Sequence, residues 1–322
     1  MVPSNAKGPA ITQIGTEAGF LPAPVVLDTR PLSFNQSTGL PNRYTLLMAP
    51  GERTDIVIDF AAFAGQTLIL YSDTPGPDPG GDPANDFYLG NRFTPTVDAT
   101  HAPNTRTIMQ FVVATATGSN RDTDSFSTWL TKMSNALATR VTELRAPSSA
   151  GAVKRILSLN EDFDDWGRLI QMVGTNVNYL GTGKRGRPYD SESTENPLKG
   201  ATEIWEIYNT TSDVHPMHFH IVNVQIMSRQ PFSDFNVFTG PARVPDANER
   251  GWKETVRMNP GEVTRVIMKF DLPTLPFVVP SSPRVASMPG LLPGKKYHEY
   301  VYHCHILEHE EHDMMRPLVV QE

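Results

Sequence analysis

Residues 201–227, ATEIWEIYNTTSDVHPMHFHIVNVQIM, indicate the fold of this chain more clearly than any other stretch. An apolar run of strand length, EIWEIYN, leads into a short polar turn and a histidine-rich motif that continues into a second apolar run. Short apolar runs that contain β-branched and aromatic residues, bounded by turn residues, are typical of β-strands. The segment therefore predicts two strands, the second of which begins with histidines.

Similar runs continue on both sides of this segment, from Ile11 to Val113 and again from Arg155 toward the last residues. Turn-forming residues separate them, and the chain has 23 glycines and 28 prolines, which suits a turn-rich β protein better than a helical one. The sequence therefore predicts an all-β fold class made of two β-sandwich-like units with little helix.

One stretch, between Asp122 and Pro147, has helical periodicity. Its apolar residues recur at intervals of three and four and would line one face of a helix. Asp122 to Ser125 offer N-caps, and Pro147 closes the segment. Because it separates the two β-rich regions, we expect this helix to connect two domains. The apolar positions are Phe126, Trp129, Leu130, Met133, Leu137, Val141 and Leu144.

Length and charge limit the possible functions. At about 150 residues per domain, a chain of 322 residues suggests two domains. The formal net charge of −7 argues against a nucleic-acid partner, which favours a basic surface. No run approaches the roughly 20 consecutive apolar residues of a membrane-spanning helix, so no membrane partner is expected. A single cysteine rules out an intrachain disulfide.

Two clusters hold most of the nine histidines. The first is HPMHFH, residues 215–220, and the second is HCHILEHEEHDMM, residues 303–315. Successive residues of a strand point to opposite faces of its sheet. Alternate histidines should therefore share a face, whereas Cys304 should point away from its two histidine neighbours.

Together the clusters offer two different sets of metal ligands. On one face Cys304 can meet His309, His215 and a methionine, which is the ligand set of a blue-copper electron-transfer site. On the other face four imidazoles converge, a set that suits copper, zinc or iron. They belong to His218, His220, His303 and His305. A zinc site, or ordinary buried histidines and a buried cysteine, are the alternatives. The Cys-x4-His-x4-Met spacing fits a zinc finger poorly, and the two clusters together favour metal binding.

Three histidines lie outside these sets. We interpret His101 as a solvated loop residue and His298 as a residue of the ligand-bearing strand that is too distant to bind. His312 follows two glutamates and is interpreted as a surface residue or one that supports the ligands.

HPMHFH and HCHILEHEEHDMM resemble the two C-terminal copper motifs of the multicopper oxidases. They are most similar to the bacterial laccase-like branch, which includes spore-coat laccase, bilirubin oxidase and phenoxazinone synthase (o-aminophenol oxidase). IGTEAGFLPAPVVL and LLMAPGERTDIVIDF resemble the family's middle domain, and LNEDFDDWGRLIQMVGT, GATEIWEIYN and GWKETV resemble its third. The resemblance implies cupredoxin-like Greek-key β-sandwiches, one partial and one complete, with an interdomain helix. The implied divisions are a partial middle domain at 1–114, a linker with the amphipathic helix at 115–154 and a copper-binding domain at 155–322.

The resemblance also implies a role for each ligand. The implied copper ligands are His215, Cys304, His309 and Met314 for type 1, His218 for type 2, and His220, His303 and His305 for type 3. Met315 is a neighbouring rival of Met314. In the family, the residue matching His309 accepts the electron of the substrate, and a carboxylate matching Glu310 helps to pass protons to the oxygen site. Glu310 could equally be a solvated acid on a short helix. Cys304, His309 and Glu310 are therefore the predicted catalytic residues.

The sequence departs from the family in its number of histidine motifs. In the family, half of the trinuclear-cluster histidines come from two His-x-His motifs of the first domain, and this chain has no further His-x-His. The chain begins within what resembles the second domain, so we expect the C-terminal portion of a longer protein, with a processed piece or a subunit of a heteromer as alternatives. The missing N-terminal cupredoxin domain or another subunit is then an expected partner, and any targeting segment would precede Met1.

The leading hypothesis is a laccase-like oxidase that takes single electrons from phenols, aminophenols or bilirubin-like compounds and reduces dioxygen to water. Its expected cofactor is copper, and its expected partners are a small aromatic reductant and O2. A blue-copper electron-transfer module without oxygen chemistry and a remnant that binds no metal are the competing hypotheses. We expect this chain alone to hold a complete type 1 site but not to reduce dioxygen efficiently.

Overall fold

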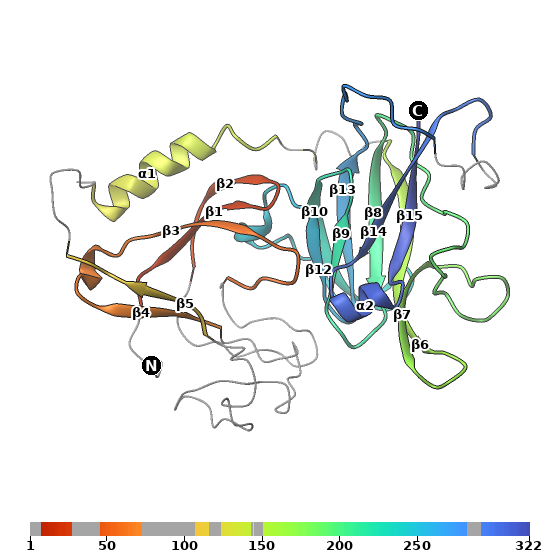
Figure 1. Cartoon of the computed structure of the whole chain (residues 1–322), viewed down its shortest axis with the longest axis horizontal. Helices are drawn as coiled ribbons and strands as arrows, with labels where there is room; N and C mark the ends of the chain where they lie inside the picture. The colour runs from red at the N-terminus through yellow and green to blue at the C-terminus, as the bar shows by residue number, and fades with distance from the viewer. Residues whose placement is uncertain are drawn as a thin grey trace. The chain divides into compact units, whose positions relative to one another are not determined.

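The computed structural model describes residues 8–27, 46–72, 107–115, 124–142, 144, 151–281 and 291–322. The chain divides into two compact units. One comprises Met1–Ile14, Ala23–Leu47 and Asp55–Ala138, and the other comprises Gly15–Pro22, Met48–Thr54 and Thr139–Glu322. Strands form most of the regular structure in the described residues, so the predicted all-β fold class is confirmed (Figure 1). None of the described helices is long and apolar enough to cross a membrane.

The first half of the chain forms short strands. β1 (Ile11–Thr16), β2 (Gly19–Val26) and β3 (Thr54–Ile58) make a sheet in the order β2-β1-β3. β4 (Thr67–Tyr71) and β5 (Thr107–Val112) form a separate antiparallel pair. These strands coincide with apolar runs that the sequence marked as strands.

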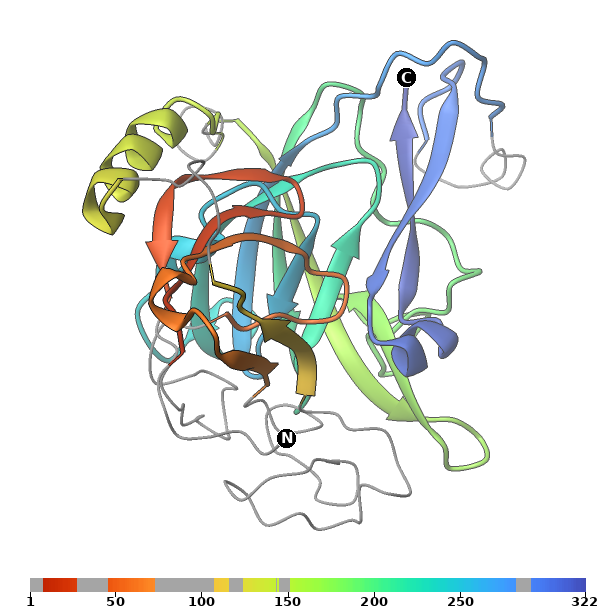
Figure 2. The same ribbon diagram turned by 60° about the vertical axis from the view of Figure 1, so that its left-hand side comes forward.

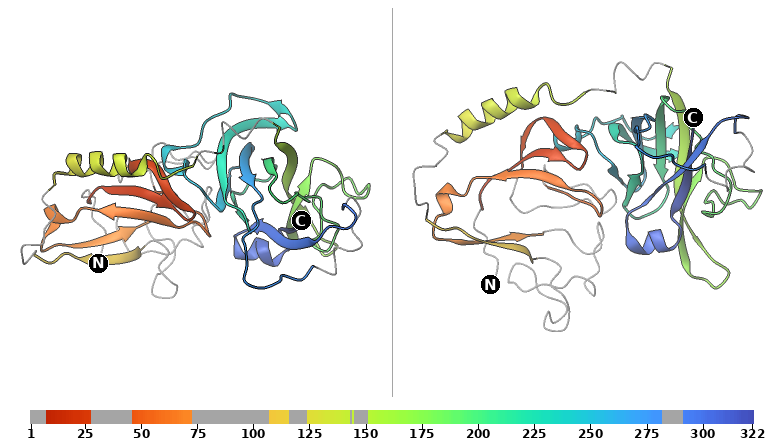
Figure 3. Two further views of the ribbon diagram at one scale, coloured as in Figure 1. Left: turned by 90° about the horizontal axis from the view of Figure 1, so that it is seen from above. Right: turned by 45° about the horizontal axis from the view of Figure 1, so that its top comes forward.

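The predicted helix is present but shorter than expected. α1 (Phe126–Leu137) is capped at its start by the side chain of Ser125 (Figure 3). It ends at Leu137, well before Pro147, where the sequence predicted its end. Beyond the end of the helix, the buried amide of Gln225 bonds two backbone groups. Its Nε2 donates to Thr142 O at 2.9 Å, and its Oε1 accepts from Leu144 N at 2.8 Å, so a distant side chain bonds the backbone groups that a longer helix would use.

The larger unit contains two sheets. The six-stranded sheet has the order β11-β10-β13-β8-β6-β7, and the four-stranded sheet has the order β12-β9-β14-β15 (Figure 1). Neighbouring strands are antiparallel except for β6 and β8, which run parallel. The strands are β6 (Val153–Phe163), β7 (Leu169–Thr175), β8 (Thr202–Asn209), β9 (His215–Phe219), β10 (Val224–Asp234), β11 (Val237–Phe238), β12 (Thr255–Met258), β13 (Glu262–Lys269), β14 (Tyr297–Cys304) and β15 (Met315–Gln321).

One apolar core joins these two sheets. The fully buried ring of Trp205, from β8, packs against Tyr302 of β14 and Phe219 of β9, with ring centroids 5.0 Å and 5.9 Å away. Each fully buried apolar side chain contributes roughly 1.5–3 kcal/mol. The packing therefore fixes β9 and β14, the two strands that carry the histidine motifs, against the larger sheet. Helix α2 (Leu307–Glu311) lies at the end where β14 turns back into β15 (Figure 2).

Buried ion pairs hold two early segments, residues 15–22 and 48–54, within the larger unit. Lys253 Nζ lies 3.1 Å from Glu17 Oε1 and 3.0 Å from Glu52 Oε1, and none of the three side chains is more than 6% exposed. Burial alone would lower the pKa of Lys253, but the carboxylates of Glu52 and Glu17 outweigh it and raise the pKa above its ordinary value. The charged lysine therefore pairs with one carboxylate from each segment, and Arg257 Nε lies 3.7 Å from Glu52 Oε2 as a second cation.

Replacing Lys253 with methionine should destabilise the chain, because buried Glu17 and Glu52 lose the ammonium group that they share, and Glu52 keeps only Arg257, whose Nε lies 3.7 Å from its Oε2. We expect the free energy of unfolding, measured by urea denaturation, to fall by about 3–5 kcal/mol. Lys154→Met is the control. The Lys154 side chain is 69% exposed and its Nζ lies 3.9 Å from Glu206 Oε1, so a loss below about 1 kcal/mol is expected. Equal losses in the two variants would show that the buried cation has no special role.

Candidate metal centres

His215, Cys304 and His309 form a buried group, which we name the cysteine site. Cys304 Sγ lies 3.7 Å from His215 Nδ1 and 3.6 Å from His309 Nδ1, and the two nitrogens are 3.2 Å apart. All three residues are at most 5% exposed. Three donor atoms that face one another at these distances can hold one metal ion. A cysteine sulfur with two imidazoles fits copper or zinc, and the copper fit requires a weak fourth ligand such as a thioether.

Two strands and a short helix assemble the cysteine site. His215 begins β9 and Cys304 ends β14, and these strands are antiparallel neighbours. His309 lies in α2, directly after β14. The chain then returns through Met314, whose N–H donates to His309 O at 2.9 Å and whose carbonyl accepts from Cys304 N at 2.9 Å. The predicted ligands thus come together from segments 94 residues apart.

The backbone register distinguishes Met314 from Met315. Met315 is paired with His303 across β14 and β15, and residues directly opposite each other point to the same face of a sheet. Met315 therefore shares the face of His303. Met314, which is fully buried, falls by alternation on the side of Cys304. This arrangement supports Met314 as the thioether of the cysteine site.

Burial sets the protonation states in the cysteine site. Burial, together with the nearby His309 ring, lowers the pKa of His215 to about 3, so its imidazole is neutral at physiological pH. Burial also raises the pKa of the Cys304 thiol to about 12, although a backbone hydrogen bond from Ile306 acts in the opposite direction. A metal ion that binds here meets two neutral imidazoles and must displace the thiol proton.

Four imidazoles gather in a second group, which we name the histidine site. His218, His220 and His303 offer ligand nitrogens that all lie within 4.8 Å of one another. His220 Nε2 and His303 Nε2 are 3.3 Å apart. The ring of His305 lies beside this group, with its centroid 5.5 Å from those of His218 and His303. The structure therefore brings the four predicted histidines together, with three of them in tighter convergence than the fourth.

The two sites share β14 but lie on opposite faces of it. His303 pairs with His218, and Cys304 pairs with Met217 on the neighbouring strand β9. Adjacent residues of a strand point to opposite faces, so His303 belongs to one site and Cys304 to the other. A single peptide bond therefore connects the cysteine site to the histidine site.

Side chains outside the ligand sets orient two of the imidazoles. Thr255 Oγ1 lies 2.9 Å from His218 Nδ1, which leaves Nε2 of that ring for a metal. Nδ1 of His303 lies 3.1 Å from the carbonyl oxygen of Cys304 and 3.6 Å from Glu310 Oε2. Glu310 is thus placed beside the histidine site.

Gly51 contacts the histidine site and was not singled out by the sequence analysis. A Cβ on Gly51 would lie 2.7 Å from Cδ2 of His305 and 3.1 Å from Thr255 Oγ1, and the backbone there has a φ of +85°. The loop around Gly51 therefore packs its bare backbone against a predicted ligand. The glycine in LLMAPGERTDIVIDF was the only signal, and a glycine in a turn has many ordinary explanations.

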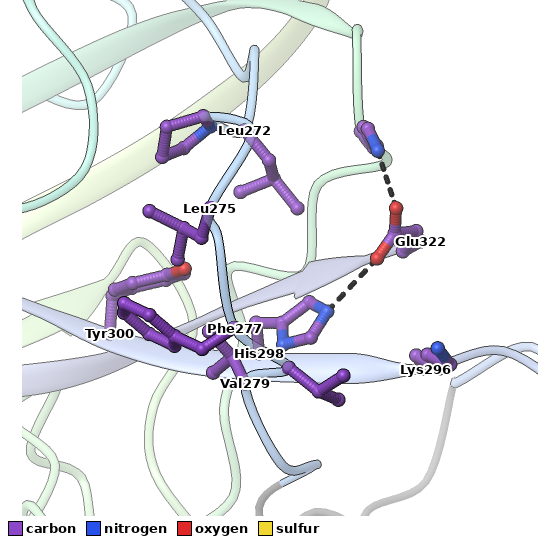
Figure 4. Close-up of a pocket in the computed structure, with 11 residues that line it drawn as sticks. Leu272, Leu275, Phe277, Val279, Lys296, His298, Tyr300 and Glu322 are labelled. Atoms are coloured by element: carbon purple, nitrogen blue, oxygen red, sulfur yellow. Dashed lines mark hydrogen bonds and ion pairs between the residues drawn. The ribbon is translucent and has the colours of Figure 1, made fainter.

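The remaining histidines lie outside both sites. His298 Nε2 is 3.1 Å from Glu322 Oε2, in a pocket of about 190 Å³ near the start of β14, at the opposite end of that strand from Cys304 (Figure 4). His312 Nδ1 is 2.8 Å from Gln171 Oε1. His101 falls outside the described residues. Among the residues that the structure describes, the cysteine and histidine sites are the two groups of three or more potential metal ligands.

Comparison with known sequences shows that this chain is similar to multicopper oxidases. A family model described as multicopper oxidase matches residues 160–278 and 292–322. A laccase from Bacillus subtilis (strain 168) is 30% identical over 319 residues, which cover 97% of this chain and 46% of the laccase. The multicopper oxidase LPR1 from Arabidopsis thaliana is 27% identical over 328 residues, covering 95% of this chain and 45% of LPR1. The chain therefore spans about half the length of the curated relatives it matches.

Comparison with solved structures supports the fold. A crystal structure of the 2F4 variant of McoA multicopper oxidase from Aquifex aeolicus matches with a TM-score of 0.56 and 21% identity, over 97% of this chain and 50% of that chain. At this level of identity the likeness shows the fold alone. It confirms the cupredoxin-like fold class that the sequence motifs implied.

Replacing Gly51 with alanine should displace His305, because the added methyl group would lie 2.7 Å and 2.9 Å from two atoms of its ring. Gly167→Ala is the control, since Gly167 also has a positive φ, +77°, but nothing within 4 Å of the added carbon. We expect Gly51→Ala to lower the free energy of unfolding by about 1–3 kcal/mol more than the control. Equal losses in denaturant melts would mean that only the backbone conformation matters at Gly51.

Proposed function

This chain belongs to the multicopper oxidase family, and from that premise we propose that it carries the substrate-oxidising half of a laccase-like enzyme. The proposed reaction is the one-electron oxidation of phenols, aminophenols or bilirubin-like compounds, coupled to the reduction of dioxygen to water. The observation that carries this proposal is the pair of ligand sets on opposite faces of β14, one containing the thiol and one made of imidazoles.

The residues of each site fit copper. We propose that the cysteine site, with Met314 as a weak fourth ligand, holds a type 1 copper, because thiolate and imidazole donors with a thioether suit that ion. In the histidine site, His218 would bind type 2 copper, and His220, His303 and His305 would bind the type 3 pair. When bound, copper supplies one-electron redox chemistry at the first site and the multi-electron reduction of dioxygen at the second.

The chain itself would shield the thiol of Cys304, connect the two sites covalently and hold a proton beside the histidine site. We propose that a reductant delivers its electron at the ring of His309, because this residue is 5% exposed whereas Cys304 is fully enclosed. Cys304 is joined by peptide bonds to His303 and His305, which gives electrons a short covalent route between the faces. Glu310, with Oε2 3.6 Å from His303 Nδ1, can hold a proton next to the oxygen-reducing site.

The histidine site needs ligands beyond those of this chain. The four imidazoles are half of the set that the family uses, and this sequence has no further His-x-His motif. We propose that the remaining histidines come from another cupredoxin domain, either of the same protein or of a second subunit. The second candidate function is blue-copper electron transfer without oxygen chemistry. It is favoured because this chain supplies a full ligand set for the cysteine site but only half of the set for the histidine site.

Copper loading separates these functions. We expect the 322-residue chain to take up copper at the cysteine site with the intense blue colour of a copper–thiolate bond, and Cys304→Ser to abolish that colour. His298→Asn is the control and should stay blue, because His298 pairs with Glu322 far along β14. Metal analysis and visible absorption measure both results. A colourless protein that retains zinc after copper reconstitution would contradict the type 1 assignment.

Oxygen uptake tests the oxidase itself. A protein in which this chain is combined with a domain carrying two further His-x-His motifs should consume dioxygen in the presence of a phenolic reductant, whereas the chain alone should not. An oxygen electrode measures both. If the combined protein is blue but takes up no oxygen with any phenolic or aminophenolic reductant, electron transfer becomes the better assignment.

A further inference from the structure

A threonine hydroxyl contacts the cysteine site from outside its ligand set. Thr211 lies in the turn between β8 and β9, and its Oγ1 is 2.6 Å from His215 Nε2, the ring nitrogen that faces away from Cys304. Both residues are buried, with Thr211 8% exposed and His215 fully enclosed. The direction of this hydrogen bond decides which nitrogen of His215 is free for a metal.

Asn209 fixes the direction, because its own partners leave no choice. Its side-chain Nδ2 lies 2.7 Å from Asp213 O and 2.9 Å from Met258 O, which are both acceptors. Its Oδ1 lies 3.0 Å from the backbone N–H of Thr211, which is a donor. If the amide were flipped, its NH2 group would face the N–H of Thr211 and its oxygen would face the two carbonyl oxygens. Neither contact can be a hydrogen bond, so the orientation of the Asn209 amide is determined.

The hydroxyl of Thr211 must then donate. Oγ1 lies 2.8 Å from Asn209 Oδ1 and 3.3 Å from Asp213 O, and both can only accept, so the single hydroxyl proton is directed to them. Two lone pairs remain on Oγ1. One accepts from Asp213 N–H at 3.2 Å, and the other faces Nε2 of His215 at 2.6 Å. With the hydroxyl proton directed to Asn209 Oδ1, this contact favours a proton on Nε2 of His215.

We propose that Thr211, held by Asn209, is a positioning residue that fixes His215 in its Nε2–H tautomer and turns the lone pair of Nδ1 toward the cysteine site. A neutral imidazole has one N–H, so a proton on Nε2 leaves Nδ1 bare. That atom lies 3.7 Å from Cys304 Sγ and 3.2 Å from His309 Nδ1. The effect on metal binding rests on the proposed copper site, whereas the tautomer itself does not.

Asn209-Thr210-Thr211 also has the form of a glycosylation sequon, but the structure gives these residues another role. Asn209 is fully buried and both atoms of its amide are bonded. Thr210 is exposed, and its Oγ1 donates to Leu159 O at 2.6 Å, away from His215. Adjacent threonines therefore differ in whether they touch the cysteine site, and Thr210→Val is a matched control for Thr211→Val.

The test compares Thr211→Val, Thr211→Ser and Thr210→Val in the 322-residue chain. Thr211→Val keeps the shape of the side chain but removes the acceptor, so we expect the affinity for Cu(II) at the blue site to fall about 10- to 100-fold. Thr211→Ser retains the hydroxyl and should bind as the unmodified chain does, as should Thr210→Val. Competition titrations followed by the blue absorption give the affinities. Equal affinities for Thr211→Val and Thr210→Val would overturn the proposal.

Nitrogen-15 NMR of the metal-free, unmodified chain tests the tautomer directly and does not require any variant to fold. A proton on Nε2 of His215 supports the proposal, and a proton on Nδ1 overturns it. The NMR result also distinguishes a failure of the tautomer from a failure of the proposed copper site. A chain that shows the Nε2–H tautomer but never becomes blue with copper would contradict the proposed function while leaving the role of Thr211 intact.

Discussion

The antiparallel register of β9 and β14 is the constraint on which both candidate metal centres depend. It sets His303 opposite His218 and Cys304 opposite Met217. Because side chains alternate along a strand, this one register sends the imidazoles to one face and the thiol to the other. A slip of one residue would exchange the faces of every side chain on β14 relative to β9 and dismantle both sites at once.

The apolar core explains why the register is held. Met217, Phe219, Cys304 and Met314 belong to the same buried cluster as Trp205, so the face that carries the cysteine site is also the face that packs against the larger sheet. A slip would replace Met217 by His218 in this cluster, and a buried polar group without a partner is costly. The same burial keeps the His215 imidazole neutral and the Cys304 thiol protonated at physiological pH.

The grouping of these side chains on opposite faces of β14 could be predicted from the sequence, because strand alternation is a local rule and both motifs are short. The β-rich fold could likewise be predicted, from the short apolar runs bounded by turn residues. Features that depend on distant partners could not be predicted. The helix periodicity ran on to Leu144, where the amide of Gln225 competes for the backbone, and nothing local revealed that competition. The packing of Gly51 on His305 and the ion pairs of Lys253 likewise join residues that are remote in sequence.

His215 and His218 show most clearly what the motif alone does not reveal, which is the ring nitrogen that each histidine directs to its site. They are three residues apart in HPMHFH, yet they use different ring nitrogens. His215 directs Nδ1 to the cysteine site while its Nε2 meets Thr211, and His218 gives its Nδ1 to Thr255. The two threonines come from different parts of the chain, one from the turn before β9 and the other from β12. The motif therefore supplies imidazoles, and the threonines around it select the nitrogen that each imidazole presents to a metal.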